Sequence, residues 1–324
     1  MKSKPIIIVA GEPYSVFLEI FFKCIKNKKT KKPIILIVSK DLFFMQMKKL
    51  GFNFKINLIN IDKIKDNSFS NKNINLININ LRFKKPFDKI SNKSNTYINN
   101  CFTAGLDILK KIQCAGLING PISKRNFLKT RFLGITEYLA KKTNKNKVVM
   151  LIYNKKLSVS PITTHLPLKN VHKHLSKNKI ISHVKLINQF YQKRLRKRPK
   201  IAITGLNPHC ESNYKSSEEE IIIKPAIKFL IKNKYNVEGP FPADTIFLKE
   251  KLKNYDVIIG MYHDQVLTPM KTHFGFDAIN ITLGLPFIRI SPDHGPNTKM
   301  LGKNLSNPKS LIEALKFLDN KWKL

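Results

Sequence analysis

Three histidines in the sequence each follow an apolar run that has the composition of a buried strand. His165 lies in TTHLPL, His209 in GLNPHCE and His263 in MYHDQ. Three neutral imidazoles that leave one position open form a catalytic metal site, for which zinc and cobalt are natural occupants. Any one of these histidines alone is better explained as a side chain bonded to a backbone carbonyl. Three in equivalent positions favour a shared divalent-metal site, provided that the strand ends bring them together.

Several charged or amide side chains interrupt segments that are otherwise apolar. Lys271, Asn280 and Arg289 lie in KTHFGFDAINITLGLPFIRIS, which we interpret as one strand–turn–strand stretch. Lysine and arginine are the usual protein partners of phosphate and carboxylate groups. Solvated charge explains most lysines in this chain, but it explains Arg289 inside LPFIRIS less well. Asp244 in PADT is predicted to be a helix N-cap for DTIFLKEKL or a site carboxylate, and the two roles can coexist.

The remaining histidines are weaker site candidates, and the common nucleotide-binding motifs are absent. His172, His174 and His183 lie in or near a lysine-rich helix and are expected to face solvent, whereas His273 and His294 stay undecided. Neither GxGxxG nor GxxxxGK[ST] occurs in the sequence, so a dinucleotide would have to be bound without a Rossmann motif or a P-loop. The GxSxG nucleophile motif is absent as well.

Short apolar runs alternate with longer amphipathic ones, which is typical of a mostly parallel sheet with helices on both faces. The expected strands are 6–10, 33–39, 55–61, 115–119, 147–153, 157–163, 200–204, 256–260 and 278–282. The expected helices are 15–26, 41–50, 96–112, 177–195, 216–231 and 308–318. In such folds ligands bind where loops leave the carboxyl ends of strands, which is where the three histidines are expected to lie.

Composition and charge bear on the class of protein. The chain has 324 residues, 42% of them hydrophobic, which indicates a folded globular protein with room for two domains. Its 59 Lys and Arg against 21 Asp and Glu give a net charge of +38, which taken alone suggests a nucleic acid or an anionic membrane as partner. We attribute the charge instead to A/T-rich codon usage, because lysine is dispersed along the chain together with Ile, Asn and Phe. We therefore expect neither a nucleic acid nor a membrane as partner.

The cysteines and the N-terminus indicate the compartment. The four cysteines are far apart and form no CxxC pair, which argues against a disulfide framework and a cysteine zinc site. The N-terminal MKSKPIIIVAGEP is interpreted as a first strand rather than a signal peptide, and no apolar run is long enough to span a membrane. We expect a protein of the reducing cytoplasm.

A family resemblance rests on motifs taken together. GEP, INGPISK, GITEYL, TTHLPL, GLNPH, GPFPADT, MYHDQ and NITLGLPFIRISPDHG occur in the order found in 4-hydroxythreonine-4-phosphate dehydrogenases of pyridoxal phosphate (vitamin B6) biosynthesis. The resemblance implies a two-domain α/β fold like that of isocitrate and isopropylmalate dehydrogenases, with mostly parallel sheets flanked by helices and an active-site cleft between the domains. It places the first domain at 1–120 plus 275–324 and the second, with the metal histidines and dimer contacts, at 121–274.

The same resemblance implies a chemistry. The expected reaction is the NAD-dependent and divalent-metal-dependent oxidation and decarboxylation of 4-phosphohydroxy-L-threonine to 3-amino-2-oxopropyl phosphate, in a homodimer with a shared active site. The metal (zinc, cobalt or magnesium) is expected on His165, His209 and His263, contributed by both subunits. The other expected site residues are Thr136, Lys271, Asn280 and Arg289 for substrate, Asn207, Asp293 and His294 for cofactor, and Lys271, Asp264 and Asp244 for catalysis.

Four segments depart from the family's pattern, among them HCESN (209–213) and DHGPN (293–297). The glycine-rich first loop is replaced by GEPYSVFLE, and the family's His-Thr pair reads Ile135-Thr136. These departures leave open a paralogous dehydrogenase that acts on another phosphorylated or carboxylated hydroxy acid. A second alternative is a non-catalytic, basic nucleic-acid-binding protein.

Overall fold

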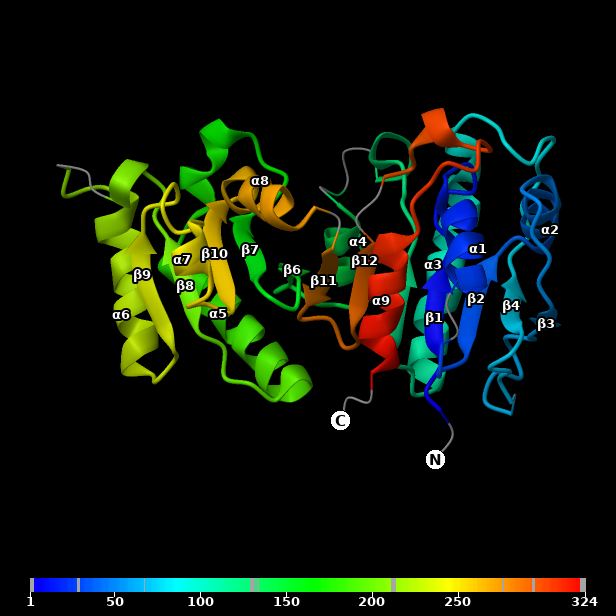
Figure 1. Ribbon diagram of the computed structural model, residues 1–324, viewed down its shortest axis with the longest axis horizontal. Helices are drawn as coiled ribbons and strands as arrows, with labels where there is room; N and C mark the ends of the chain where they lie inside the picture. Colours follow the sequence, from blue (N-terminus) through cyan, green and yellow to red (C-terminus); the bar gives the residue numbers. More distant parts are fainter. Residues whose placement is uncertain are drawn as a thin grey trace. The chain divides into compact units, whose positions relative to one another are not determined.

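The protein is described by a computed structural model that covers residues 3–27, 30–66, 68–128, 132, 134–210, 214–275, 277–292 and 295–320. The chain divides into two compact units (Figure 1). The first unit extends to Tyr138 and takes up the chain again at Pro286–Asn320, and the second comprises Leu139–Leu285. The predicted domain limits, 1–120 plus 275–324 and 121–274, stay a prediction.

The first unit is built on a parallel sheet. Its strands are arranged in the order β3–β4–β2–β1–β5–β12, and each of them runs parallel to its neighbours. The strand bounds are β1 Ile6–Val9, β2 Ile34–Val38, β3 Ile56–Leu58, β4 Ile74–Asn78, β5 Gly116–Asn119 and β12 Arg289–Pro292. Strands β1 and β2 are continuous apolar runs with every residue buried, as expected for a parallel sheet that is covered on both faces.

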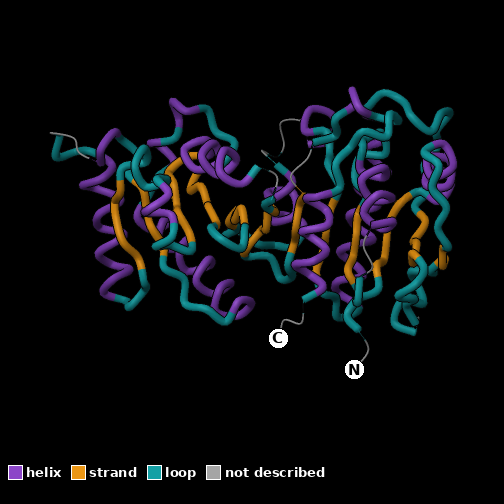
Figure 2. The backbone as a smooth tube through the Cα atoms, viewed as in Figure 1, coloured by secondary structure: helices purple, strands orange, loops and turns teal. Residues whose placement is uncertain are grey.

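Helices cover both faces of this sheet (Figure 2). They are α1 Phe17–Asn27, α2 Lys40–Lys49, α3 Asn95–Lys111 and α9 Lys309–Asp319. Helix α1 packs against α2 and α9, and α3 packs against β1 and β2. Helix α1 connects β1 to β2, whereas α3 connects β4 to β5 in the opposite direction along the sheet. Since both connections are expected to be right-handed, α3 lies on the face opposite to α1.

The second unit has a mixed sheet in the order β11–β6–β7–β10–β8–β9. The strand bounds are β6 Val149–Tyr153, β7 Ser158–Thr163, β8 Ile201–Thr204, β9 Val237–Phe241, β10 Val257–Tyr262 and β11 Ile279–Leu283. Strand β6 runs antiparallel to β7 and to β11, whereas β7, β10, β8 and β9 are mutually parallel. The carboxyl ends of β7, β10 and β8 therefore lie side by side at one edge (Figure 1).

Strand β7 shows how alternate residues serve the two faces of this sheet. Val159 belongs to an apolar core with Val266 and Met270 of helix α8 (His263–Phe274). The next residue, Ser160, points to the other face, where its hydroxyl lies 2.6 Å from Nε2 of His183 on helix α5 (Lys177–Phe190). His183 is 5% exposed, so the prediction that it faces solvent is wrong. The lysines of α5 occupy the outer face of an amphipathic helix, and His183 lies on the inner one.

The mostly parallel α/β architecture predicted from the alternating pattern is confirmed. The predicted strands and helices correspond to observed ones, but β4, β9 and helices α4 (Ile135–Lys142) and α8 were not predicted. Strand β12 is the second strand of the predicted strand–turn–strand stretch, and α7 (Lys249–Leu252) covers only the end of the helix considered for DTIFLKEKL. Helix α6 (Lys224–Lys232) forms the second half of the predicted helix 216–231, after a π-helical turn at Glu219–Ile223. Within the described residues, no helix is long and apolar enough to cross a membrane.

Candidate active site

The three predicted metal ligands follow three strands at one edge of the second unit's sheet. His165 comes two residues after the last residue of β7, His263 directly follows β10, and His209 lies in a short helical turn after β8. Since β7, β10 and β8 are adjacent and parallel, the three segments that carry these histidines leave the same edge. The strand-end prediction for these histidines is thus consistent with where the topology places them.

Two of the imidazoles converge. The ring centroids of His165 and His263 lie 5.9 Å apart, and both side chains are half-buried. Nδ1 of His263 lies 2.6 Å from a carboxylate oxygen of Asp264. A carboxylate on one ring nitrogen fixes the orientation of a metal-binding imidazole and leaves the other nitrogen as the ligand atom. Asp264 therefore fits a role in orienting His263.

His209 has an unusual backbone. It is exposed and adopts φ 59° and ψ 4°, and the following Cys210 has φ 57°. Residues other than glycine that adopt left-handed conformations cost on the order of 1–2 kcal/mol each, so the surrounding structure must hold this turn in place. Among the described residues, no group of three His, Cys, Asp or Glu side chains is close enough to hold a metal ion. Imidazole nitrogens, of which two converge here and a third lies on a neighbouring loop, are nevertheless a donor type that divalent metals such as zinc take.

The other predicted residues of the second unit are distributed over the same elements. Asp244 is exposed in a turn after β9, and α7 begins only at Lys249 with Leu248 as its N-cap, so Asp244 does not cap that helix. The pKa of the Cys210 thiol is raised by burial, then by Glu219 and by Asp244, which places the Asp244 charge near the His209 turn. Lys271 lies exposed in α8 rather than on a strand, and Asn280 is half-buried on β11. The predicted strand–turn–strand stretch is therefore helix–strand–turn–strand.

In the first unit, Arg289 is the centre of a buried polar cluster. Its side chain is fully buried at the start of β12, and its Nε donates a hydrogen bond of 2.7 Å to Oδ1 of Asn119 at the end of β5. The Asn119 amide nitrogen donates in turn to the Gly120 carbonyl at 2.8 Å. Burial lowers the pKa of Arg289 to about 9, and the nearby Glu137 carboxylate acts in the opposite direction. Glu137 follows the predicted substrate residue Thr136, which is 8% exposed in the first turn of α4.

This cluster includes two residues that the sequence prediction did not single out. Asn119 and Glu137 both lie in motifs that were quoted for the resemblance, INGPISK and GITEYL. Asn119 could have been identified as a candidate site residue because it is a polar residue at the end of an apolar strand. A fully buried arginine requires anionic or strongly polar partners, so this cluster suits the binding of an anionic group.

The altered first loop contains a buried acid. Glu12 of GEP is 2% exposed, and its backbone N–H donates to the Pro121 carbonyl at 2.9 Å, which joins this loop to the loop after β5. Burial raises the pKa of Glu12 from 4.5 to about 7, against a smaller lowering by the backbone N–H of Tyr14. Gly11 adopts φ 80°, and a β-carbon there would come within 2.5 Å of the Pro121 carbonyl oxygen, so only glycine fits.

Of the three predicted cofactor residues, only Asn207 lies within the described residues. Asn207 donates its side-chain N–H to carboxylate oxygens of Glu218 and Glu219, at 3.0 and 2.8 Å. Asp293 and His294 lie outside the described residues, as does the segment 211–213 that follows the His209 turn.

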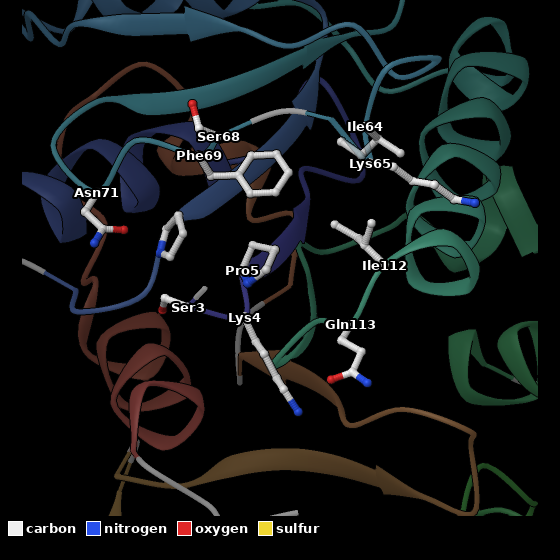
Figure 3. Close-up of a pocket in the computed structure, with 11 residues that line it drawn as sticks. Ser3, Lys4, Pro5, Ile64, Lys65, Ser68, Phe69, Asn71, Ile112 and Gln113 are labelled. Carbon is white, nitrogen blue, oxygen red and sulfur yellow. The ribbon is translucent and has the colours of Figure 1, made fainter. Parts of the chain in front are cut away.

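A separate cavity of about 520 Å³ lies in the first unit, where Pro5 and Pro33 immediately precede β1 and β2. In Figure 3 the side chains of Pro5, Ile64, Phe69 and Ile112 gather around the hollow, whereas Lys65 extends away from it. This is the amino edge of the sheet. Ligands in parallel α/β sheets bind at the carboxyl edge, where Asn119 lies, so we do not assign this cavity to the active site.

Comparison with solved structures first defines the architecture. Isocitrate dehydrogenase from Methylococcus capsulatus is similar with a TM-score of 0.51 at 9% identity, over 97% of this chain and 84% of that chain, which is a likeness of fold alone. The 4-hydroxythreonine-4-phosphate dehydrogenase from Klebsiella pneumoniae is much more similar, with a TM-score of 0.83 at 27% identity over 98% and 97% of the two chains. The predicted dehydrogenase-like α/β fold is thereby confirmed.

Sequence comparison then gives the family. The family model described as pyridoxal phosphate biosynthetic protein PdxA matches residues 29–318. A 4-hydroxythreonine-4-phosphate dehydrogenase from Sulfurihydrogenibium sp. (strain YO3AOP1) is 38% identical over 316 residues, which cover 95% of each chain. This chain belongs to the PdxA family, as the order of its motifs predicted.

Proposed function

We propose that this protein is an NAD-dependent 4-hydroxythreonine-4-phosphate dehydrogenase that acts in pyridoxal 5'-phosphate biosynthesis. Its substrate would be 4-phosphohydroxy-L-threonine and its product, after decarboxylation, 3-amino-2-oxopropyl phosphate. The observation that carries this proposal is the similarity to the Sulfurihydrogenibium dehydrogenase over 95% of both chains. The three histidine-bearing loops at one sheet edge and the buried arginine cluster support it.

The proposed reaction has two steps. A hydride leaves the carbon that bears the substrate hydroxyl and passes to NAD, while the hydroxyl proton is lost, which gives NADH and a 3-oxo acid. The 3-oxo acid then loses carbon dioxide, and the carbon left behind takes up a proton. We propose Lys271 and Asp244 as groups that hold or transfer these protons, and Asp264 as the carboxylate that orients His263 through its 2.6 Å contact.

We propose that His165, His209 and His263 hold a divalent metal, with zinc, cobalt or magnesium as candidates. When bound, such a metal acts as a Lewis acid that stabilises negative charge developing on the substrate. The protein's own contribution is to orient the imidazoles and to bind the substrate's anionic groups. Thr136, Lys271, Asn280 and Arg289 are the proposed substrate contacts, and Asn207, Asp293 and His294 the proposed NAD contacts. We further propose a homodimer in which both subunits supply ligands.

Activity measurements on metal-stripped protein test this proposal. NADH formation with 4-phosphohydroxy-L-threonine is followed after zinc, cobalt or magnesium is added back, in the wild type and in His209→Ala. His172→Ala is the matched control, because His172 is an exposed histidine of the same unit that is not a proposed ligand. Metal-dependent turnover that is lost only in His209→Ala supports the proposal. Equal turnover in chelator and in metal contradicts the metal's role.

One observation favours a second candidate. Ile135 stands where the family has a histidine, next to the proposed substrate contact Thr136. A paralogue that oxidises another phosphorylated or carboxylated hydroxy acid would leave 4-phosphohydroxy-L-threonine unreacted but turn over another member of a hydroxy-acid panel. Ile135→His restores the family's residue, and a gain of activity on 4-phosphohydroxy-L-threonine in that variant would favour the paralogue.

A further inference from the structure

The ends of the three strands that carry the candidate ligands are joined to one another by side-chain hydrogen bonds. The hydroxyl of Thr163, the last residue of β7, donates to the Met261 carbonyl on β10 at 2.7 Å. This bond ties the strand that leads to His165 to the strand that leads to His263. Two further side chains, Gln265 and Glu219, connect β10 to β8 and to the turn that contains His209.

Gln265 bridges β10 and β8 with its whole carboxamide. Its Oε1 accepts hydrogen bonds from the Met261 backbone N–H at 2.7 Å and from the Thr204 hydroxyl at 3.0 Å. Its Nε2 donates to the Gly205 carbonyl at 2.9 Å. Thr204 and Gly205 end β8 and begin the His209 loop, while Gln265 lies two residues after His263. The side chain of Gln265 thus fixes β10, which leads to His263, against the start of the loop that carries His209.

Glu219 fixes the next part of the His209 loop. Its side chain is 0% exposed, and its Oε1 accepts from the backbone N–H groups of Leu206 at 2.7 Å and Asn207 at 2.9 Å. Its Oε2 accepts from the Asn207 side chain at 2.8 Å. The loop is therefore held by a buried carboxylate immediately before the left-handed His209. A β-carbon at Gly205 would lie 2.9 Å from Oε1 of Glu219, so glycine at this position leaves room for the carboxylate.

We propose that Gln265 and Glu219 are positioning residues of the metal centre: they do not bind the metal but hold the His209 turn in its strained conformation and in register with His263. This inference rests on the proposed role of His165, His209 and His263 as metal ligands. The exposed, left-handed His209 lies in a turn of only three residues, Pro208–Cys210, so we infer that its position depends on these bonds. Loss of partners that orient metal ligands commonly weakens metal binding by about 10- to 100-fold.

Cobalt binding measures this role without relying on turnover. Metal-free full-length protein is titrated with Co²⁺ in competition with a chelator, which gives the dissociation constant, and the visible absorption of the bound ion reports its coordination. The variants are Gln265→Met, which keeps the size of the side chain but removes its hydrogen bonds, and Glu219→Gln, which loses the second acceptor. We expect about 10- to 100-fold weaker cobalt binding and an altered visible spectrum in both variants.

Two matched variants control for loss of stability alone. Gln46 is a buried glutamine of the first unit whose Nε2 donates to the carbonyls of Pro13 and Pro86, so Gln46→Met removes equivalent bonds away from the ligand loops. Glu220→Gln changes the neighbour of Glu219 that forms an ion pair with Lys224. Both controls are expected to bind cobalt with the wild-type affinity.

The outcomes separate this inference from the proposed function. If the wild type binds no cobalt, or if His209→Ala binds it as tightly, the metal proposal itself fails. If His209→Ala weakens binding but folded Gln265→Met and Glu219→Gln keep the wild-type affinity and spectrum, the positioning role is overturned. Should Gln265→Met not fold, Thr204→Val removes one of the same bonds in a milder way, and an unchanged affinity in Thr204→Val overturns the role of Gln265.

Discussion

The buried acid Glu12 leads to a prediction about stability and pH. In the unfolded chain its carboxyl group ionises near the ordinary pKa of 4.5, whereas burial raises the pKa in the folded protein to about 7. Between these values the folded state binds more protons than the unfolded state, so the free energy of unfolding falls as pH rises. The difference between the two pKa values corresponds to a loss of about 3 kcal/mol, complete above pH 7 and absent below pH 4.5.

Glu12→Gln keeps the shape of the side chain but cannot ionise. At pH 4.5 and below, where the wild-type carboxyl is protonated in both states, the two proteins should have similar free energies of unfolding. At pH 8 the variant should be the more stable by about 3 kcal/mol. Urea unfolding, followed by circular dichroism at both pH values, measures this difference.

A matched control shows whether burial of the carboxyl group causes the pH-dependent difference in stability. Glu250 is an exposed glutamate in the first turn of α7, and Glu250→Gln should change stability by less than about 0.5 kcal/mol at either pH. If the advantage of Glu12→Gln over the wild type is the same at both pH values, the argument that burial perturbs this carboxyl is refuted.

Three further predictions concern polar side chains. Asn119→Leu removes the acceptor of the hydrogen bond from Arg289 Nε. Because a charge-assisted bond is lost, we expect the KM for 4-phosphohydroxy-L-threonine to rise about tenfold or more. The control Asn75→Leu, which changes a buried asparagine on β4, should leave KM unchanged. Burial lowers the pKa of His183 from 6.5 to about 3. As pH falls from 6.5 to 3, the free energy of unfolding of the wild type should therefore fall by up to about 5 kcal/mol relative to that of His183→Gln. Equal acid sensitivity of the two proteins in urea unfolding would contradict this. Asp264→Asn should weaken cobalt binding by about tenfold in the chelator assay if the Asp264 carboxylate orients His263, and unchanged binding would show that it does not.

Much of the fold could be predicted from the sequence because its strands are unbroken apolar runs. Strand β4 (INLIN) was missed because two asparagines interrupt its apolar run, and Asn75 is buried through bonds to the carbonyls of Ile34 and Ser70 that no local pattern reveals. Helix α8 was missed because Pro269 lies inside it, a residue that normally indicates a helix end. That error left Lys271 in a stretch interpreted as strand–turn–strand, with no helix.

The candidate site could be predicted only where its residues follow strands. His165, His209 and His263 share that position, and the parallel pairing of β7, β10 and β8 brings their loops to one edge. The supporting residues Gln265, Glu219, Asn119 and Glu137 could not be inferred in the same way. Their partners lie far away along the chain, as in the bond between Arg289 and Asn119, and exposed polar residues of the same types are common throughout the sequence.

The stoichiometry of the reaction tests the central claim most directly. Metal-loaded protein is incubated with NAD and a limiting amount of 4-phosphohydroxy-L-threonine, and NADH, carbon dioxide and the phosphorylated product are each quantified at completion. The proposed function predicts one NADH and one carbon dioxide for each substrate consumed, with 3-amino-2-oxopropyl phosphate as the product. A folded, metal-loaded protein that forms neither NADH nor carbon dioxide from this substrate would contradict it.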